Sequence, residues 1–136
     1  MLKKYWLKVN GSEKDMDMLW YSLNNMPKNR KEYKEEFGDL CFKGMRSNWF
    51  PCVLIGFYGY LEYDGKMEEA EKARSLFKYF SDNEKYRSIY IDDAIITNDG
   101  IEIICRCKGN LRDYTLSKIF SLCGINAYTV QHLKDC

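Results

Sequence analysis

The sequence lacks an apolar run of transmembrane length and the features of a signal peptide. The N-terminus has charged residues but neither the apolar stretch nor the small-residue cleavage site of a signal peptide. No apolar run approaches the roughly 20 residues that a transmembrane helix needs. We therefore expect a soluble, cytoplasmic protein. Its six cysteines are expected to be free thiols, because disulfide frameworks belong to oxidising compartments.

An excess of either charge is also lacking. Lys and Arg together number 21, Asp and Glu number 20, and the formal net charge is +1. This balance excludes a protein that binds polyanions through its overall charge, and it excludes a mimic of DNA, but not local charged patches. Proline is scarce, at two residues, whereas Lys, Asn, Ile, Tyr and Phe are heavily used. That usage is typical of an A/T-rich genome and indicates a bacterium, a phage or another mobile element as the source.

The usual motifs of catalysis and metal binding are missing as well. Gly56 and Gly59 lie three residues apart but precede no helix N-terminus, so they predict no phosphate-binding loop. A cysteine nucleophile would need His132, the single histidine, as its base, with Cys52 or Cys107 as its partner. Cys105 and Cys107 have the spacing of a strand rather than of a structural zinc knuckle. We expect no resident metal ion and no cofactor.

What the chain does have is a surplus of aromatic residues, at 15%. The longest apolar and aromatic run extends from Phe50 to Gly65 near the middle of the chain. Its β-prone residues, interrupted by two glycines, predict the central strand of a sheet. More aromatic residues are present than a small core needs, and exposed aromatic side chains usually contact a partner.

Apolar periodicity and turn residues predict the other elements. Ser12 with Asp15 is a typical helix N-cap pair, Pro27 ends that helix, and Asn98-Asp99-Gly100 is a strong hairpin turn. The mixed-charge run over 28–36 is a loop or a helical turn. The predicted strands lie at 3–10, 39–45, 50–65, 88–97, 101–108 and 127–133, and the predicted helices at 12–26, 66–80 and 111–123.

The order of these elements predicts an α+β fold. From Cys52 onward it is strand, helix, strand, strand, helix, strand, the order of a ferredoxin-like β-α-β-β-α-β sandwich. We expect a single α+β domain over 1–136, with a core at 50–136 and an extra N-terminal strand and helix in an extension at 1–49. A second frame, from Lys3 to Thr97, fits the same order. In both frames the helices cover one sheet face and leave the other open.

Strand alternation predicts the inward side chains Tyr5, Leu7 and Val9, then Ile89, Ile91 and Ile95, and then Ile101, Ile103, Cys105 and Cys107. It places aromatic and basic residues on the open face, and the turn before the central strand adds others. The candidate apolar anchors and their basic neighbours are Lys4, Trp6, Lys8, Arg46, Trp49, Tyr58, Tyr60, Tyr90 and Arg106. Tyr, Trp and Arg are the residues that anchor protein contacts. The same mixture suits base stacking and phosphate pairing as in RRM-type domains, although the RRM sequence motif is absent. A third interpretation is that a further element covers this face and makes it a second core layer.

The tetrapeptide Tyr90-Ile91-Asp92-Asp93 resembles the Tyr-x-Asp-Asp motif of reverse-transcriptase palms, which lies on a hairpin of a ferredoxin-like core. The resemblance covers four residues. It implies paired carboxylates that hold two divalent metal ions for phosphoryl transfer, with Asp64 as the candidate for a further aspartate. The chain departs from the palm because its hairpin tip is 98–100 and it has no room for fingers. The structural alternative is an exposed Asp92 and an Asp93 at a bulge or strand edge.

Three function classes follow. The first is a non-catalytic accessory or inhibitory protein that occupies the surface of a protein partner, or of a second copy of itself. The second is a protein that binds single-stranded nucleic acid or a nucleotide through the same aromatic and basic face. The third is a metal-dependent phosphoryl-transfer enzyme that uses Asp92 and Asp93. We favour the first class and expect no membrane contact.

Overall fold

The structure is a computed structural model that describes residues 2–27, 31, 33–109, 111, 113–125 and 128–135. Three short 3₁₀ helices, η2 (Gly38–Leu40), η3 (Phe50–Cys52) and η4 (Glu84–Tyr86), connect longer elements. The strands and helices are β1 (Leu2–Val9), α1 (Glu13–Asn24), α2 (Lys34–Phe37), α3 (Val53–Tyr63), α4 (Met67–Asp82), β2 (Ile89–Thr97), β3 (Gly100–Lys108), α5 (Asp113–Ser121) and β4 (Tyr128–Asp135).

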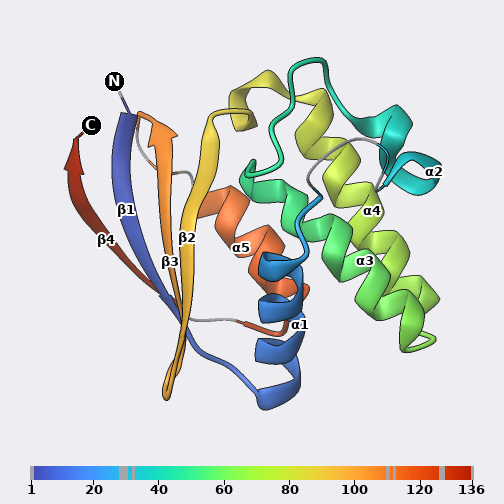
Figure 1. The fold of residues 1–136 in the computed structure, drawn as a ribbon, viewed down its shortest axis with the longest axis horizontal. Helices are drawn as coiled ribbons and strands as arrows, with labels where there is room; N and C mark the ends of the chain where they lie inside the picture. Colours follow the sequence, from blue (N-terminus) through green and yellow to red (C-terminus); the bar gives the residue numbers. More distant parts are fainter. Residues whose placement is uncertain are drawn as a thin grey trace.

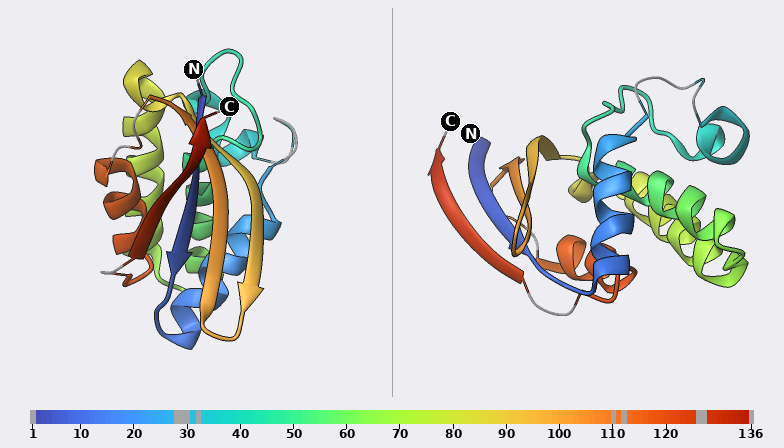
Figure 2. Two further views of the ribbon diagram at one scale, coloured as in Figure 1. Left: turned by 90° about the vertical axis from the view of Figure 1, so that its left-hand side faces the viewer. Right: turned by 60° about the horizontal axis from the view of Figure 1, so that its bottom comes forward.

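The four strands form one antiparallel sheet in the order β2-β3-β1-β4. Helices α1 and α5 lie against one face of it, and α3 pairs with α4 on the side of α1 and α5 that is remote from the sheet (Figures 1 and 2). No helix of the described residues lies on the opposite sheet face. The structure therefore confirms a mixed α+β fold with a four-stranded antiparallel sheet and five helices.

Alternating side chains join the sheet to the helices. On β1, Tyr5, Leu7 and Val9 are buried, and on β3 so are Ile101, Ile103, Cys105 and Cys107. These residues belong to one continuous core that also includes the inner sides of α1, α3, α4 and α5. The predicted inward faces of both strands are confirmed. In the described part of the chain, no helix is both long enough and apolar enough to cross a membrane.

The predicted N-cap of the first helix is confirmed. The Ser12 hydroxyl accepts a hydrogen bond from the backbone N–H of Asp15, at 3.2 Å, and donates one to the Asp15 carboxylate, at 2.6 Å. Such a cap satisfies backbone donors that the first turn of a helix leaves without partners. Asn110 with Asp113 is a second N-cap pair that the sequence predicts, but Asn110 lies outside the described residues, as do positions 28–30 and 32 of the charged run.

The central strand predicted over 50–65 is wrong, because this stretch forms η3 and α3. Nearly every residue in this stretch is apolar or aromatic, so the two-residue period of a strand and the 3.6-residue period of a helix fit the sequence equally well. A buried helix explains the pattern, since a helix enclosed on several sides is apolar around most of its circumference. Its buried residues are Val53, Leu54, Gly56, Phe57, Tyr58 and Leu61.

At Gly56, α3 packs closely against α1. A Cβ atom built on Gly56 would lie 2.7 Å from the Ser22 Oγ and 2.8 Å from the Ser22 Cα. Ser22 is itself buried, and its hydroxyl donates to the Met18 carbonyl of its own helix at 2.9 Å. Glycine at this position thus permits a backbone-to-backbone approach that any side chain would prevent.

The ferredoxin-like sandwich is not confirmed in the form that the sequence predicted. The strand expected at 39–45 is replaced by η2 and a turn in which Gly44 has a φ of 85°. The strand and helix expected as an N-terminal addition are instead integral, because β1 lies between β3 and β4 in the sheet. Both predicted frames count 50–65 as a strand, and the frame from Lys3 to Thr97 also counts 39–45, so neither frame matches the observed elements.

A β-bulge alters the alternation along β2. The pairing of β2 with β3 shifts between Ile91 and Asp93, so that Asp92 is the additional residue. Before the bulge Ile89 and Ile91 point into the core, as predicted. After it, Ile95 pairs with Glu102 and is 51% exposed, although the sequence placed it on the inner side. A single inserted residue moves every following side chain to the other face.

Candidate functional site

The candidate site is the sheet face opposite the helices, which no described element covers (Figure 2). We call it the open sheet face. Cross-strand pairing arranges its side chains in three rows that run across the sheet. The rows are Tyr90, Arg106 and Lys4; then Asp93, Ile104, Trp6 and Gln131; then Ile95, Glu102, Lys8 and Thr129.

Trp6 occupies the middle row on a central strand, beside Ile104 of β3. Its indole Nε1–H donates to the Glu102 carboxylate at 2.8 Å. That hydrogen bond satisfies the polar atom of the ring and fixes its orientation. The ring face therefore remains as apolar surface, with the aliphatic side chain of Ile104 next to it.

In the first row, an ion pair, a hydrogen bond and a cation–π contact fix the side chains. The Arg106 Nε lies 2.8 Å from one oxygen of the Asp92 carboxylate and 2.9 Å from the other. Tyr90 donates its hydroxyl to the Arg87 carbonyl at 2.9 Å. The Arg46 guanidinium lies 5.8 Å from the centre of the Tyr90 ring, a cation–π contact. Arg46 comes from the loop before η3, so this loop brings a basic side chain to the edge of the open sheet face.

Six of the nine predicted binding residues thus come together on or beside this face: Lys4, Trp6, Lys8, Arg46, Tyr90 and Arg106. Trp49 does not join them, because it is fully buried. Its backbone bridges to Tyr90, and its ring packs edge-on against Phe42 at 4.9 Å between ring centres. The sequence placed Trp49 in a turn and could not show that this turn pairs with the outer edge of β2.

Tyr58 and Tyr60 also lie away from the open sheet face, because they are on α3. Tyr58 is buried, packs edge-on against Phe37, and donates its hydroxyl to the Glu36 carboxylate at 3.3 Å. Tyr60 contacts Tyr21 of α1, with 5.8 Å between ring centres. Their predicted place on the sheet was wrong for the same reason as the central strand itself.

Tyr58 gives the fold a dependence on alkaline pH. Burial, followed by the hydrogen bond to Glu62 and the charge of Glu36, raises the pKa of Tyr58 to about 12 from its ordinary value of 10. Between these two values the folded protein keeps a proton that the unfolded chain has lost, so the free energy of unfolding falls as the pH rises through this window. Below pH 10 the stabilisation is fully present.

We expect urea unfolding to show this loss of stability between pH 10 and pH 12. In Tyr58→Phe the decline over that window should be shallower, because the phenol that titrates is gone. Tyr63→Phe is the control, since Tyr63 is on the same helix and is 93% exposed. Equal slopes in native protein and Tyr58→Phe would contradict the assignment.

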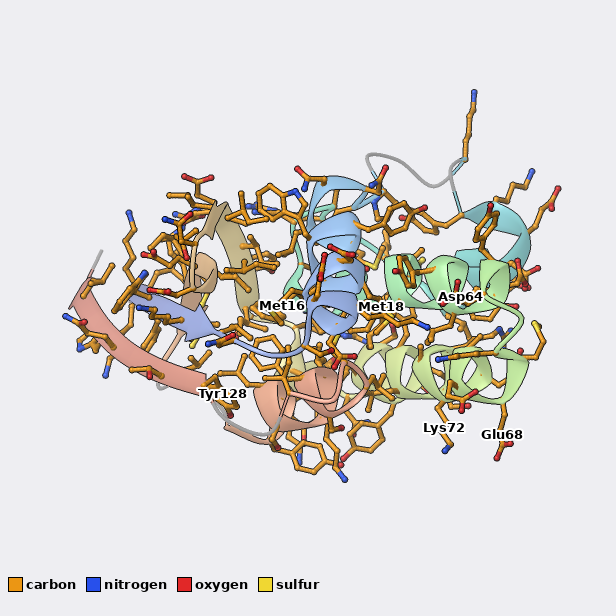
Figure 3. All side chains as sticks on the ribbon, turned by 90° about the horizontal axis from the view of Figure 1, so that it is seen from below. Met16, Met18, Asp64, Glu68, Lys72 and Tyr128 are labelled. Carbon is orange, nitrogen blue, oxygen red and sulfur yellow. The ribbon has the colours of Figure 1, made fainter. Side chains whose placement is uncertain are left out.

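The acidic residues of the palm-like tetrapeptide are already engaged. Asp92 pairs with Arg106, and the Asp93 carboxylate accepts from the backbone N–H of Ala94 at 2.8 Å. Asp64 is at the end of α3, remote from the sheet, and pairs with Lys14 at 3.3 Å (Figure 3). Within the described ranges, no group of three or more His, Cys, Asp or Glu side chains could hold a metal ion.

The cysteines are placed as core side chains. Burial raises the pKa of Cys105 to about 12, and it also raises the pKa of the Cys52 and Cys123 thiols, so these groups stay protonated near neutrality. In the sheet, β1 lies between Cys107 of β3, which pairs with Lys3, and His132 of β4, which pairs with Tyr5. Cys52 is in η3, outside the sheet. Neither of the two predicted cysteines is therefore on a strand next to that of His132.

Sequence reasoning missed two kinds of residue on the open sheet face. Glu102 and Ile104 alternate with the inward residues of β3, so their outward direction could have been read from the period of two. The outward direction of Ile95 could not be predicted, since no feature of the sequence indicates the bulge at Asp92.

The comparisons with known proteins found no relative: no protein-family model, no curated protein and no solved structure matches this chain. The open sheet face is therefore the main evidence about function.

Proposed function

We propose that this chain is a non-catalytic binding protein that docks a protein partner on its open sheet face. The observation that carries the proposal is an uncovered sheet whose centre is the oriented ring of Trp6 with Ile104 beside it. A buried aromatic anchor with a polar rim is the usual composition of a binding hot spot. Such a protein acts as an accessory or inhibitory factor, by occupying its partner's surface.

The charges of the face indicate what the partner carries. Glu102 and Asp92 are both engaged within the face, the first by Trp6 and the second by Arg106. Lys8 is exposed, and Lys4 is partly exposed. We infer a partner with an apolar pocket for Trp6 and acidic side chains around it.

Nucleic acid is the weaker candidate for the same surface. Stacking of successive bases needs several aromatic platforms. On this face β3 supplies no aromatic residue, β1 supplies Trp6, and β2 supplies Tyr90, whose ring already contacts Arg46. The carboxylates of Glu102, Asp92 and Asp93 stand among the basic residues and would repel phosphates. These features favour a protein partner.

We also propose that the core is a ferredoxin-like sandwich with an insertion. The units β1-α1-β2 and β3-α5-β4 and the strand order β2-β3-β1-β4 support this assignment. In this frame η2, η3 and the helices α2 to α4 form one insertion between α1 and β2. The open face is then the one that such sandwiches leave free for binding.

Affinity capture tests the proposed function. The native chain is used as bait in a nuclease-treated lysate of the source cell, beside Trp6→Ala and Tyr63→Ala. We expect a protein that is retained by native bait and by Tyr63→Ala, and whose affinity for Trp6→Ala is lower by about tenfold or more, the loss typical of a hot-spot aromatic residue.

Salt dependence separates the two kinds of partner. A contact anchored by Trp6 should change little between 50 and 200 mM salt, whereas a protein that contacts 6–10 phosphates loses about 10³–10⁵ in affinity over that range. Capture that disappears after nuclease treatment, or that Trp6→Ala leaves unchanged, would overturn the proposal. Circular dichroism of Trp6→Ala confirms that the variant is folded.

A further inference from the structure

A pocket of about 450 Å³ lies where the start of β2, the end of β3 and the start of α5 come together (Figure 1). We call it the strand-end pocket. It is on the helix side of the sheet, because Ile89 and Cys107, which point into the core, form part of its wall. Its volume is within the range of about 300–1,000 Å³ that is typical of small-molecule sites. The strand-end pocket is therefore separated by the sheet from the open sheet face.

The wall of the strand-end pocket combines apolar and polar groups. Ile89, Leu111 and Tyr86 contribute apolar surface. Ser88, just before β2, and Thr115, in the first turn of α5, contribute hydroxyl groups. An apolar wall with a small number of polar groups is the usual composition of a pocket that binds a small molecule, since the polar groups fix the orientation of the ligand.

Thr115 has a hydroxyl group that the fold does not use. Only 2% of this residue is exposed, and in the described part of the chain its hydroxyl makes no hydrogen bond. Ser81 is a buried residue whose unpaired oxygen is fully enclosed, whereas Thr115 borders the strand-end pocket. Buried hydroxyl groups are normally hydrogen-bonded. The Thr115 hydroxyl is thus available to a molecule bound in the pocket.

The charges around the pocket favour an anion. Lys85 lines it, and the Lys85 Nζ lies 5.2 Å from the centre of the Tyr86 ring. The described residues of the wall include no aspartate or glutamate, and Lys85 has no ion pair with a described carboxylate. The N-terminal turn of α5, which contains Thr115, adds the partial positive charge of a helix start. Lys108 also borders the pocket, but it alternates with Cys107 along β3, so its side chain belongs to the other sheet face.

We propose that the strand-end pocket binds a small monocarboxylate with an apolar body. The carboxylate accepts hydrogen bonds from the Lys85 ammonium group and from the Thr115 hydroxyl, and such charge-assisted bonds are the stronger ones in proteins. The flexible four-carbon stem of Lys85 lets its ammonium group turn from the Tyr86 ring to the ligand. The apolar body lies against Ile89 and Leu111. One ammonium group and one helix start match the single negative charge of a carboxylate.

Saturation-transfer difference NMR tests the pocket with three probes, benzoate, benzamide and acetate, at matched ionic strength. Benzamide has the shape of benzoate without its charge, and acetate has the charge without the ring. We expect saturable binding of benzoate, about tenfold or more tighter than that of benzamide, because hydrogen bonds to a charged group are stronger. Acetate should also bind more weakly than benzoate, since it leaves the apolar wall without a contact. No saturable signal from benzoate, or equal affinities for benzoate and either other probe, would overturn the proposal.

Two variants test the assigned donors. Lys85→Met should lower the affinity for benzoate about tenfold or more and leave the affinity for benzamide unchanged. Thr115→Val keeps nearly the same shape and removes the hydroxyl, so it should lower the affinity for benzoate as well. Because this hydroxyl has no partner among the described residues, Thr115→Val should not lower the midpoint of urea unfolding. A residue with only a structural role would show the reverse pattern.

The controls separate a specific site from general attraction to positive charge. Lys78→Met removes a lysine of α4 that pairs with Asp82, and Trp6→Ala changes the open sheet face, so both variants should bind benzoate as the native chain does. Near-ultraviolet circular dichroism checks that each variant retains its packing. Benzoate affinity that is unchanged in Lys85→Met and Thr115→Val, or that falls equally in Lys78→Met, would show that the strand-end pocket is not the site.

Discussion

Trp49→Ala is expected to lower the free energy of unfolding by about 3–5 kcal/mol, the usual cost of removing a large aromatic side chain from a core. Trp49 is fully buried, and its ring packs against Phe42 and against Phe77 of α4. Its indole Nε1–H donates to the Tyr86 carbonyl at 3.0 Å. The substitution therefore leaves both a cavity and a buried carbonyl without its donor.

The location of Trp49 extends the effect to the contact between the sheet and the helices. The backbone N–H of Ile91 donates to the Asn48 carbonyl at 2.8 Å, beside the bridge between Trp49 and Tyr90. This segment therefore connects the edge of the sheet to the helices α3 and α4. A loss of this size is a large fraction of the 5–15 kcal/mol that stabilises a typical domain, and it corresponds to a fall in Tm of roughly 10–20 °C.

Urea unfolding followed by far-ultraviolet circular dichroism measures the loss. Trp49→Phe is the matched variant, because it retains a six-membered aromatic ring but loses the five-membered ring that donates to Tyr86, so we expect it to cost about 1–3 kcal/mol. Trp20→Ala, at a partly exposed position of α1, should cost less than Trp49→Ala. An unfolding free energy of Trp49→Ala close to that of the native chain would show that Trp49 is not part of the core.

Gly56→Ala is expected to destabilise the protein by about 2–3 kcal/mol, the upper part of the range for an overpacked core. The added Cβ would lie 2.8 Å from the Ser22 Cα, so a backbone has to move and no rotamer change relieves the contact. The change should be seen as a lower midpoint of urea unfolding without a change of slope, since the surface exposed on unfolding stays similar.

Gly59→Ala gives the matched control on the same helix. A Cβ on Gly59 meets no atom within 4 Å. Alanine is better than glycine in a helix interior by about 0.8–1.0 kcal/mol, so Gly59→Ala should stabilise the protein. Opposite signs at two glycines three residues apart would support a helix in this region. Equal effects would contradict the close crossing of α1 and α3.

These two glycines also show where sequence reasoning reaches its limit. A strand assignment treated Gly56 and Gly59 as breaks in a pleated run, but in the fold Gly56 is a helix contact and Gly59 faces open space. The elements that were predicted correctly have a clear amphipathic period, such as β1 with Tyr5, Leu7 and Val9 inward. Where almost all residues are apolar, as in α3, periodicity carries no information and only tertiary packing decides.

The candidate binding residues likewise include some that the sequence places correctly and others that it does not. Lys4, Trp6 and Lys8 could be placed on one face, because they alternate with buried residues of β1. Tyr58 and Tyr60 could not, since their place depended on the misassigned run. The contacts among the rings of Tyr79, Tyr86 and Tyr114 could not be predicted for a different reason. These residues lie on α4, η4 and α5, which long-range folding brings together, and the sequence contains no motif that links them.

The position of β1 has a consequence for how the chain acquires its structure during synthesis. Leu2 pairs with Lys108, and Val9 pairs with both Ile101 and Tyr128, so the first strand to be synthesised has no partner until about 100 residues later. At a translation rate of 5–20 residues per second, about 5–20 s pass between the synthesis of β1 and the synthesis of its partner strands. Meanwhile the hairpin of α3 and α4 involves only near neighbours in the chain and can form early. The apolar side of β1 is therefore the segment of the nascent chain that most needs protection from association with other chains.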